Sequence, residues 1–577
     1  MAEFNSREGL GASLVVRSCH ACGQDLTGYD DMVGLRGGIG GSNRGSQEEG
    51  SFSAGHGGGG HGGLACLTPG GLGSSVWLLA SMSLGVGVFV QPKVVASVGW
   101  LVGVALIVLF AVVTNYSQYL LLIVTEECRA EDTEALQQKG QEHEGSGCGE
   151  GGEGGEGGEG GAAVVPSYGA LALRVLGRPG LMAGATATML TCLIGNAAHL
   201  STISEMLHDI GAWYFTGSFD NAVFPAGKRA VVIALLAAFA LPFCFAEQLA
   251  ALRHMSTVSV FTCVTLSLSM IVLAAQQIAE HGVAAGAEPV PAVVGGSGGG
   301  GGGAGAILSA AGAICFTYSS VINLVNVYGE MQPRTLRHGT RAVSAATGLC
   351  CAIYTAVALL CVLAWGTACD SPSGNVLYLI SMRNYWVDFW CFALIVCITL
   401  LYPVINFPMV ANAETVLLLL VTGEVPGTAA CAERVGKLER APGAVARALR
   451  ARRAFISVGG ALVVVAIDAA VADLADLFGL CGSLGLGTIS MVLPALMYLR
   501  NRHGHERPAA HVLGAGATLL IGLVVTFGTT GTAACAARVR AGARPWLTRP
   551  LSKHRLSVLP LSVHTARPGV ILHGLIA

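Results

Sequence analysis

The sequence predicts an all-α protein that crosses a membrane about eleven times. The first reason is composition: of the 577 residues, 53% are hydrophobic and 12% are charged, whereas a soluble domain carries about 25% charged residues. The second reason is that the charges crowd into a few stretches, and between them lie apolar runs of about 20 residues, long enough to cross a hydrocarbon core of roughly 30 Å. The third is that the sequence lacks the short alternating segments of a membrane β-barrel.

Each apolar run predicts one helix, taken in order along the chain. The first five spans are expected at residues 74–95, 101–124, 181–207, 230–245 and 258–276. The remaining six are expected at residues 306–327, 342–365, 389–410, 455–471, 477–499 and 511–535.

Low-complexity segments flank and interrupt these spans. Residues 1–73 are polar and rich in glycine, which predicts a disordered tail on the cytosolic side. Residues 74–535 then form the transmembrane domain, with low-complexity loops at 125–165, where a Gly/Glu repeat lies, and at 277–305, where a glycine run lies. Residues 536–577 form a basic C-terminal tail.

Lysine and arginine predict the orientation, because cytosolic loops carry an excess of them. The basic residues fall mainly after the even-numbered spans, and the densest group follows the eighth, which places the N-terminus in the cytosol. An odd number of spans then places the basic tail on the opposite side. Either the count is off by one span, or the last helix does not cross fully, or the tail is unusual.

Several functions are excluded by what the sequence lacks. The net charge of −2 comes without a basic, aromatic-laced patch, so no nucleic acid is expected as a partner. Most of the 18 cysteines lie in apolar runs, where a thiol is a small apolar filler. The Cys-His-Ala-Cys sequence at 19–22 lacks a second ligand pair for zinc, so we expect no metal site. The sequence has no Walker A or HExxH motif, and no GxSxG motif inside or beside the membrane, so we expect neither an enzyme nor a cofactor.

The sequence Gly-Val-Gly-Val-Phe-Val-Gln-Pro, which begins at Gly85, interrupts the first span. Glycine weakens a helix by about 1 kcal/mol and proline removes a donor. Irregular backbone inside a membrane persists only where protein or a watery cavity covers it, and the free amides of such a break can hold a carboxylate. The glycines are equally compatible with close packing of a neighbouring helix.

The sixth span contains a second unusual stretch, five spans after the first. A cluster of small hydroxyls and one aromatic side chain, Thr317, Tyr318, Ser319 and Ser320, lies in an otherwise apolar helix. Interrupted helices at matching places in two five-span halves indicate a transporter site at the repeat interface. The alternative is that the hydroxyls bond back to carbonyls one turn earlier.

Six stretches in this order resemble the amino acid/auxin permease family, which includes vesicular, vacuolar and sodium-coupled neutral amino acid transporters. The resemblance extends from about residue 74 to about residue 520. The stretches are GVGVFVQPKVVASVGW from Gly85, SYGALALRVLGRPG from Ser167, FALPFCFAEQLAALRHMS from Phe239, VYGEMQPR from Val327, LLYPVINFPM from Leu400 and LFGLCGSLGLGTISMVLPALMYL from Leu477.

The resemblance implies a leucine-transporter-like fold, in which two inverted repeats of five helices are followed by one extra helix. It implies amino acid transport by alternating access, driven by H⁺ or Na⁺. In that fold the amides of Gly85, Val86 and Gly87 would receive the substrate carboxylate. The side chains from Phe316 to Ser320 would face the amino group and side chain of the substrate.

Four residues are candidates for ion coupling. Thr399 is the hydroxyl nearest to the position of an ion site that the resemblance implies. Sodium-coupled members carry asparagines before the first glycine pair, and Ser81 occupies one of these places here, which weakens the case for sodium. Lys93 costs ~3 kcal/mol near mid-membrane and should face the bundle or a cavity, unless it snorkels to the interface. His199 is either a proton relay or a hydrogen-bonded packing residue.

These observations together predict a secondary active transporter of amino acids, coupled to H⁺. The alternatives are a Na⁺-coupled symporter and a receptor that keeps the fold and binds amino acids without moving them. We expect a small neutral amino acid as substrate and the lipid bilayer as surroundings, in the plasma membrane or a vacuolar or lysosomal membrane. Protein partners are not indicated by the sequence.

Overall fold

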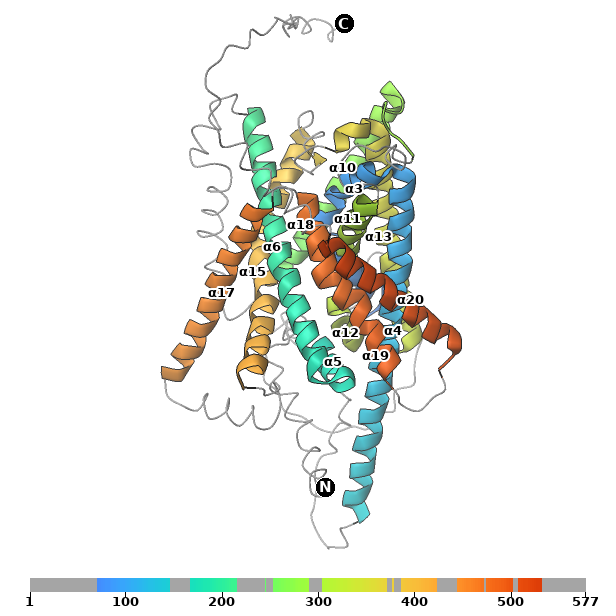
Figure 1. Ribbon diagram of the computed structural model, residues 1–577, viewed down its shortest axis with the longest axis vertical. Helices are drawn as coiled ribbons and strands as arrows, with labels where there is room; N and C mark the ends of the chain where they lie inside the picture. Colours follow the sequence, from blue (N-terminus) through green and yellow to red (C-terminus); the bar gives the residue numbers. More distant parts are fainter. Residues whose placement is uncertain are drawn as a thin grey trace, which may run out of the picture. The chain divides into compact units, whose positions relative to one another are not determined.

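The computed structural model describes residues 70–145, 167–214, 244, 253–289, 304–370, 376–377, 385–422, 444–471, 474–501 and 507–531 (Figure 1). All regular elements in these residues are helices, as predicted, and no strand occurs among them. The helices of the first part are α2 (Leu72–Ser83), η5 (Val86–Phe89), α3 (Gln91–Val98), α4 (Trp100–Gly145), α5 (Tyr168–Leu176), α6 (Arg178–Tyr214) and α10 (Arg253–His281). The second part contains α11 (Ala304–Thr317), α12 (Val321–Glu330), α13 (Leu336–Trp365), η9 (Gly366–Cys369), α15 (Tyr385–Thr422), α17 (Ala444–Ala470), α18 (Leu474–Leu480), η10 (Cys481–Val492), α19 (Leu493–Arg500), α20 (Ala509–Leu523) and η11 (Val524–Gly528).

The helices confirm a polytopic membrane protein. Within the described residues, nine stretches are long and apolar enough to cross a membrane. They correspond to all the predicted spans except the first and the fourth. The first is divided into shorter helices, and the fourth, at residues 230–245, lies almost entirely outside the described residues. The number eleven therefore stays a prediction. The predicted tails at 1–73 and 536–577 also lie outside the described part, apart from residues 70–73.

The first predicted span is broken where its glycines lie. Helix α2 ends at Ser83, and Gly85 follows in an extended conformation with φ −131° and ψ −159°. One short 3-10 turn, η5, leads into α3, which carries Pro92 in its first turn, where a missing backbone N–H costs nothing. Gly99, with a φ of 82°, ends α3, because only glycine adopts this conformation without strain.

The sixth predicted span is broken at its hydroxyl cluster. Helix α11 ends at Thr317 and α12 begins at Val321, with a turn of three residues between them. The two broken spans pack against each other, α3 and η5 against α11, and α2 against α12. Figure 1 shows α3, α11 and α12 in the middle of the molecule.

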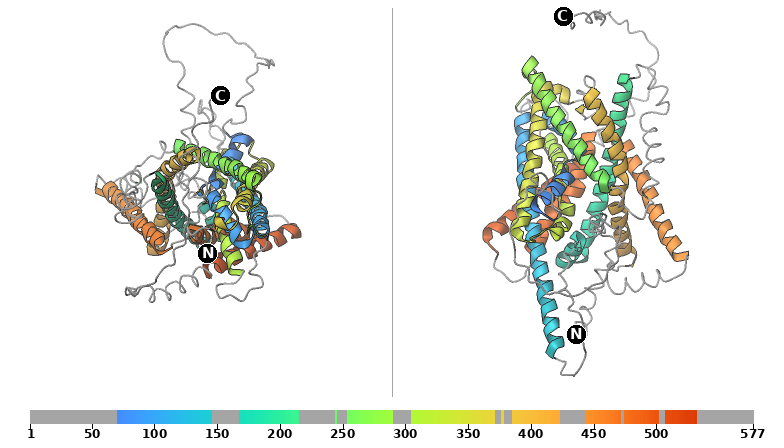
Figure 2. Two further views of the ribbon diagram at one scale, coloured as in Figure 1. Left: turned by 90° about the horizontal axis from the view of Figure 1, so that it is seen from above. Right: turned by 180° about the vertical axis from the view of Figure 1, so that it is seen from behind.

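Helix α4 continues well past the end of its predicted span. The expected loop at 125–165 is wrong in its first part, because the helix runs to Gly145. Residues 126–145 are rich in Glu and Gln, which favour a helix even where no membrane surrounds them. At 1.5 Å per residue, the 46 residues of α4 span about 69 Å, more than twice the hydrocarbon core. The end of α4 extends beyond the other helices in both side views (Figures 1 and 2).

Burial separates central from peripheral helices. In the stretch Leu474–Arg500, 78% of the apolar window is buried, whereas the value is 22% for Arg452–Ala470 and 28% for Ala509–Gly531. The central stretch contains η10, a π-helix of 12 residues that packs against α11, α6 and α20. Two of these contacts have no room for a side chain. A Cβ on Gly482 would lie 1.8 Å from Gly312 O of α11, and a Cβ on Gly485 would lie 1.8 Å from Thr191 Oγ1 of α6.

Candidate functional site

The structure brings the two predicted breaks into direct contact. A Cβ placed on Gly87 would lie 2.8 Å from Thr317 Cγ2 and 3.4 Å from Phe316 Cδ1. The backbone of η5 therefore rests on the last turn of α11, and glycine is required at this approach. The other glycine of the pair is different, because a Cβ on Gly85 would meet nothing within 4 Å.

The backbone amides at the start of η5 are available to an anion. The carbonyls of Gly85 and Gly87 accept from Val88 N at 3.2 Å and from Val90 N at 3.3 Å. The amides of Val86 and Gly87 have no partner within so short a helix, and no backbone carbonyl of the described residues accepts from them. Such amides can receive a carboxylate, as the sequence predicts for this turn.

Only one hydroxyl of the α11–α12 break bonds back along its own helix. Thr317 Oγ1 donates to Ile314 O at 2.7 Å, and Gln91 Nε2 of α3 donates to the same hydroxyl at 3.3 Å. The other three side chains of the cluster bond across to different helices: Ser319 Oγ donates to Met82 O at 2.9 Å, Gln118 Nε2 donates to Ser320 Oγ at 2.8 Å, and Tyr318 Oη donates to Ile107 O at 3.2 Å. The cluster thus joins α11 and α12 to α2 and α4.

An aromatic pair lies next to the amides of η5. The ring of Phe316, which is half-buried and within 3.5 Å of the Cβ position of Gly87, packs at 4.7 Å between centroids on Phe478 of α18. The site therefore combines free amides, small hydroxyls and one apolar wall. This combination suits a small molecule with a carboxylate and an uncharged side chain.

The four ion-coupling candidates do not gather at one point in the described contacts. Ser81 Oγ donates to Leu78 O at 2.7 Å, and Thr399 Oγ1 donates to Ile395 O at 2.8 Å, so each hydroxyl bonds within its own helix. Lys93 is 7% exposed in α3, so it is covered by protein rather than directed to the lipid.

His199 is the fourth candidate. It is 9% exposed in α6, and its Nδ1 atom has no hydrogen-bond partner among the described residues. One turn earlier on α6, both polar side-chain atoms of Asn196, which is 1% exposed, also lack partners there. Buried polar groups are normally paired, so this stretch of α6 has hydrogen-bonding capacity that no described residue uses.

Sequence reasoning missed three polar residues of the site. Gln91 and Gln118 each carry an amide into an apolar span, and this signal could have identified them. Tyr354 of α13 could not have been identified in this way. Its hydroxyl lies 2.6 Å from Ser83 O and 2.9 Å from Thr317 O, so it touches both breaks.

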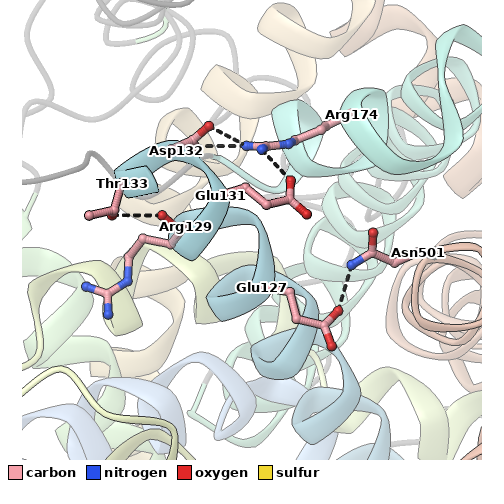
Figure 3. A network of polar contacts seen from close by, with 7 residues as sticks. All are labelled: Glu127, Arg129, Glu131, Asp132, Thr133, Arg174 and Asn501. Carbon is pink, nitrogen blue, oxygen red and sulfur yellow. Dashed lines mark hydrogen bonds and ion pairs between the residues drawn. The ribbon is translucent and has the colours of Figure 1, made fainter. Parts of the chain in front are cut away.

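The end of α4 on the predicted cytosolic side carries a second polar group, drawn in Figure 3. Arg174 of α5 donates from Nη1 to both Asp132 oxygens at 2.8 Å, and from Nη2 to Glu131 Oε2 at 2.7 Å. One turn earlier, Glu127 accepts from Asn501 Nδ2 at 2.6 Å. Helix α4 is thereby tied to α5 and to the end of α19. Burial alone lowers the pKa of the Arg174 guanidinium, but its hydrogen bond to Asp132 and the nearby carboxylates reverse this and raise that pKa.

We expect the change Arg174→Gln to lower the free energy of unfolding by about 1 kcal/mol, because partly exposed ion pairs contribute about 0.2–1 kcal/mol each. The deficit relative to the parent should shrink at high salt, which screens these charges. The matched control is Arg129→Gln, which removes a pair with Glu126 on the same helix and should cost only a few tenths of a kcal/mol. Denaturant unfolding at two salt concentrations measures both, and equal deficits would show that Arg174 does not tie α5 to α4.

Comparison with known proteins finds a matching family and similar solved structures. A sequence model of a family described as transmembrane amino acid transporter protein matches residues 68–138 and 160–533, which is well over half of the chain. Among solved structures, the manganese transporter of Eremococcus coleocola, crystallised with an aromatic bis-isothiourea substituted compound, is 12% identical. That match covers 82% of this chain and 92% of that chain, with a TM-score of 0.40. No curated protein sequence matches significantly.

Proposed function

The chain belongs to the transmembrane amino acid transporter family, and from this premise we propose that it moves amino acids across its membrane by H⁺-coupled secondary active transport. Its apolar helices make it a multi-pass membrane protein. The substrate we propose is a small neutral amino acid, and the membrane is the plasma membrane or that of a vacuole or lysosome.

One observation carries the proposal: two membrane spans are broken, and the two breaks are in contact with each other. The amides of Val86 and Gly87 and the end of α11 at Thr317 lie on either side of this contact. Discontinuous helices at a repeat interface are where transporters of this kind hold substrate and coupling ion. The amides at the start of η5 suit a carboxylate, and the carbonyl end of α11 suits an ammonium group.

The apolar surface beside the break supports a small neutral substrate. Phe316 and Phe478 form an apolar surface beside the amides, and the small hydroxyls are already engaged in contacts between helices. A substrate side chain that contacts this surface gains from apolar burial and finds few free polar groups.

The way the broken helices are held supports transport by alternating access. The short pieces α2 and α12 are joined to their continuations by only a few residues, so each piece can tilt without unfolding the rest. The contacts of α4 with α5 and α19 lie at the predicted cytosolic end, away from the break. We propose that these contacts close the cytosolic side in the conformation described here.

Uptake of radiolabelled amino acids into proteoliposomes tests the function. An imposed pH gradient should drive uptake of small neutral amino acids, and a proton ionophore should abolish it. Uptake that requires a Na⁺ gradient instead would establish the sodium-coupled alternative. If neither gradient moved any amino acid, while amino acids still raised the thermal stability of the purified protein, the receptor function would replace the transporter.

A further inference from the structure

Tyr354 connects the ends of both broken helices. It is fully buried at 0% exposure, and its hydroxyl lies 2.6 Å from the carbonyl of Ser83 and 2.9 Å from the carbonyl of Thr317. Ser83 is the last residue of α2 and Thr317 is the last residue of α11. A single oxygen atom therefore lies at the point where two helix termini meet.

Two helix-terminal carbonyls at one place need a cation or a hydrogen-bond donor to satisfy them. The last carbonyls of a helix have no partner within the helix, and they form the negative end of its dipole. Where two discontinuous helices direct these ends to one place, transporters use them to coordinate a coupling cation. Here the O–H group of Tyr354, which carries one proton, is shared between the two carbonyls.

The surroundings hold this hydroxyl in place. The ring of Tyr318 packs edge-on against the ring of Tyr354, with 5.4 Å between centroids and 74° between planes. One turn before Tyr354, the thiol of Cys350 lies 3.8 Å from Ala80 O. Helix α13 therefore contacts the end of α2 through both Cys350 and Tyr354. The hydroxyl is thus a fixed part of the helix junction.

We propose that the Tyr354 hydroxyl takes the place of a coupling cation between the ends of α2 and α11, so that the junction holds its shape without Na⁺. Tyr354 is then a positioning residue: it fixes the two breaks relative to each other, and the ion that drives transport acts elsewhere. This inference rests on the proposed function, which it deepens by making the substrate site independent of sodium.

The test compares Tyr354→Phe with Tyr402→Phe as a matched control. Tyr402 is 4% exposed in α15, and its hydroxyl has no hydrogen-bond partner among the described residues, so the control removes a buried hydroxyl that supports no carbonyl. The melting temperature is measured in sodium chloride and in choline chloride of equal concentration, together with binding of radioactive sodium. Neither measurement depends on transport.

We expect the parent and Tyr402→Phe to melt at the same temperature in both salts and to bind no sodium. In Tyr354→Phe the exposed carbonyls should bind sodium and raise the melting temperature by about 2–4 °C in sodium chloride. Amino acid uptake by this variant should fall about tenfold without sodium and recover in part when sodium is added. If Tyr354→Phe yields no folded protein, the same measurements are made on Tyr354→Asn, which leaves more space and keeps a polar side chain.

Two results would overturn the inference. One is a Tyr354 variant that folds but responds to sodium in neither melting nor binding; the other is a parent that already binds sodium and is stabilised by it. If no form of the protein moved amino acids, the proposed function would fail, while the sodium measurements would still decide the role of Tyr354.

Discussion

Replacing Gly87 with leucine is expected to lower gradient-driven amino acid uptake by about 100-fold or more, because displacement of a reacting or binding group by even 1 Å commonly costs this much. The first atom of the new side chain would already lie 2.8 Å from Thr317 Cγ2, and the rest would enter the space beside Phe316. Thr317 cannot turn away freely, since its hydroxyl donates to Ile314 O and accepts from Gln91. The two breaks would have to separate, and the amides of η5 would lose their position.

The matched control is Gly348→Leu. Gly348 lies in the long helix α13, where an added Cβ meets nothing within 4 Å. Uptake should then stay close to that of the parent, which separates the loss of a site from a general effect of a larger side chain. Gly87→Ala should be intermediate, because its Cβ makes the 2.8 Å contact with Thr317 Cγ2 but no further side-chain atoms enter the space beside Phe316. If Gly87→Leu transported normally, amino acids would not pass through the junction of η5 and α11.

Binding of substrate by the purified protein distinguishes the cause of the loss. A Gly87→Leu variant that melts like the parent but is no longer stabilised by amino acids has lost the site and not the fold. A variant that also melts at a much lower temperature has lost the packing of η5 on α11, and its uptake then reports on stability alone. The expected result is the first, since the contact lies at a break where few other backbone groups depend on it.

The broken helices could be predicted from sequence because their residues conflict with an uninterrupted span. Gly85, Gly87 and Pro92 are poor helix formers, and the hydroxyl cluster after Phe316 is polar without being charged. These are local signals, and the structure places the breaks where they occur. The residues that contact the breaks are distant in the sequence and have no such signal. Tyr354 is an example: from sequence, a tyrosine in an apolar span is interpreted as a packing residue, and only the structure shows that it contacts both breaks.

Two other features escaped prediction for different reasons. The extension of α4 to Gly145 falls within the loop predicted at 125–165 because of its Gly/Glu repeat, although helix propensity favours the helix that forms in these residues. The π-helix η10 has no local signal at all. It occurs where Gly482 and Gly485 let the chain approach two neighbouring helices closely, and these contacts are visible only in the folded structure.

The close approach at η10 leads to the largest expected effect on stability. A Cβ on Gly482 would lie 1.8 Å from Gly312 O and 2.9 Å from Phe316 N. Both atoms belong to the backbone of α11, so no side chain can rotate to make room, and the two helices would have to move apart. We expect Gly482→Ala to lower the free energy of unfolding by about 3 kcal/mol or more, the upper range for overpacked cores.

Gly516→Ala in α20 provides the matched control, because a Cβ there meets nothing within 4 Å. It should leave stability unchanged or raise it by about 0.5–1 kcal/mol, since alanine favours a helix over glycine. A thermal melt of the purified protein measures both changes. Equal melting temperatures for the two variants would mean that η10 and α11 are not in contact as described.

A second substitution on the facing helix tests whether this contact also matters for function. A Cβ on Gly312 would lie 2.7 Å from Gly479 O, at the same junction, so Gly312→Ala should separate the helices by itself. Once one alanine has forced them apart, the second should cost less, and the double variant should be less destabilised than the sum of the single ones. Because Phe316 and Thr317 continue the same helix, separation at Gly312 displaces the break as well. A Gly482→Ala variant that folds at low temperature should therefore show weaker substrate binding, whereas intact binding would show that the end of α11 keeps its position independently of η10.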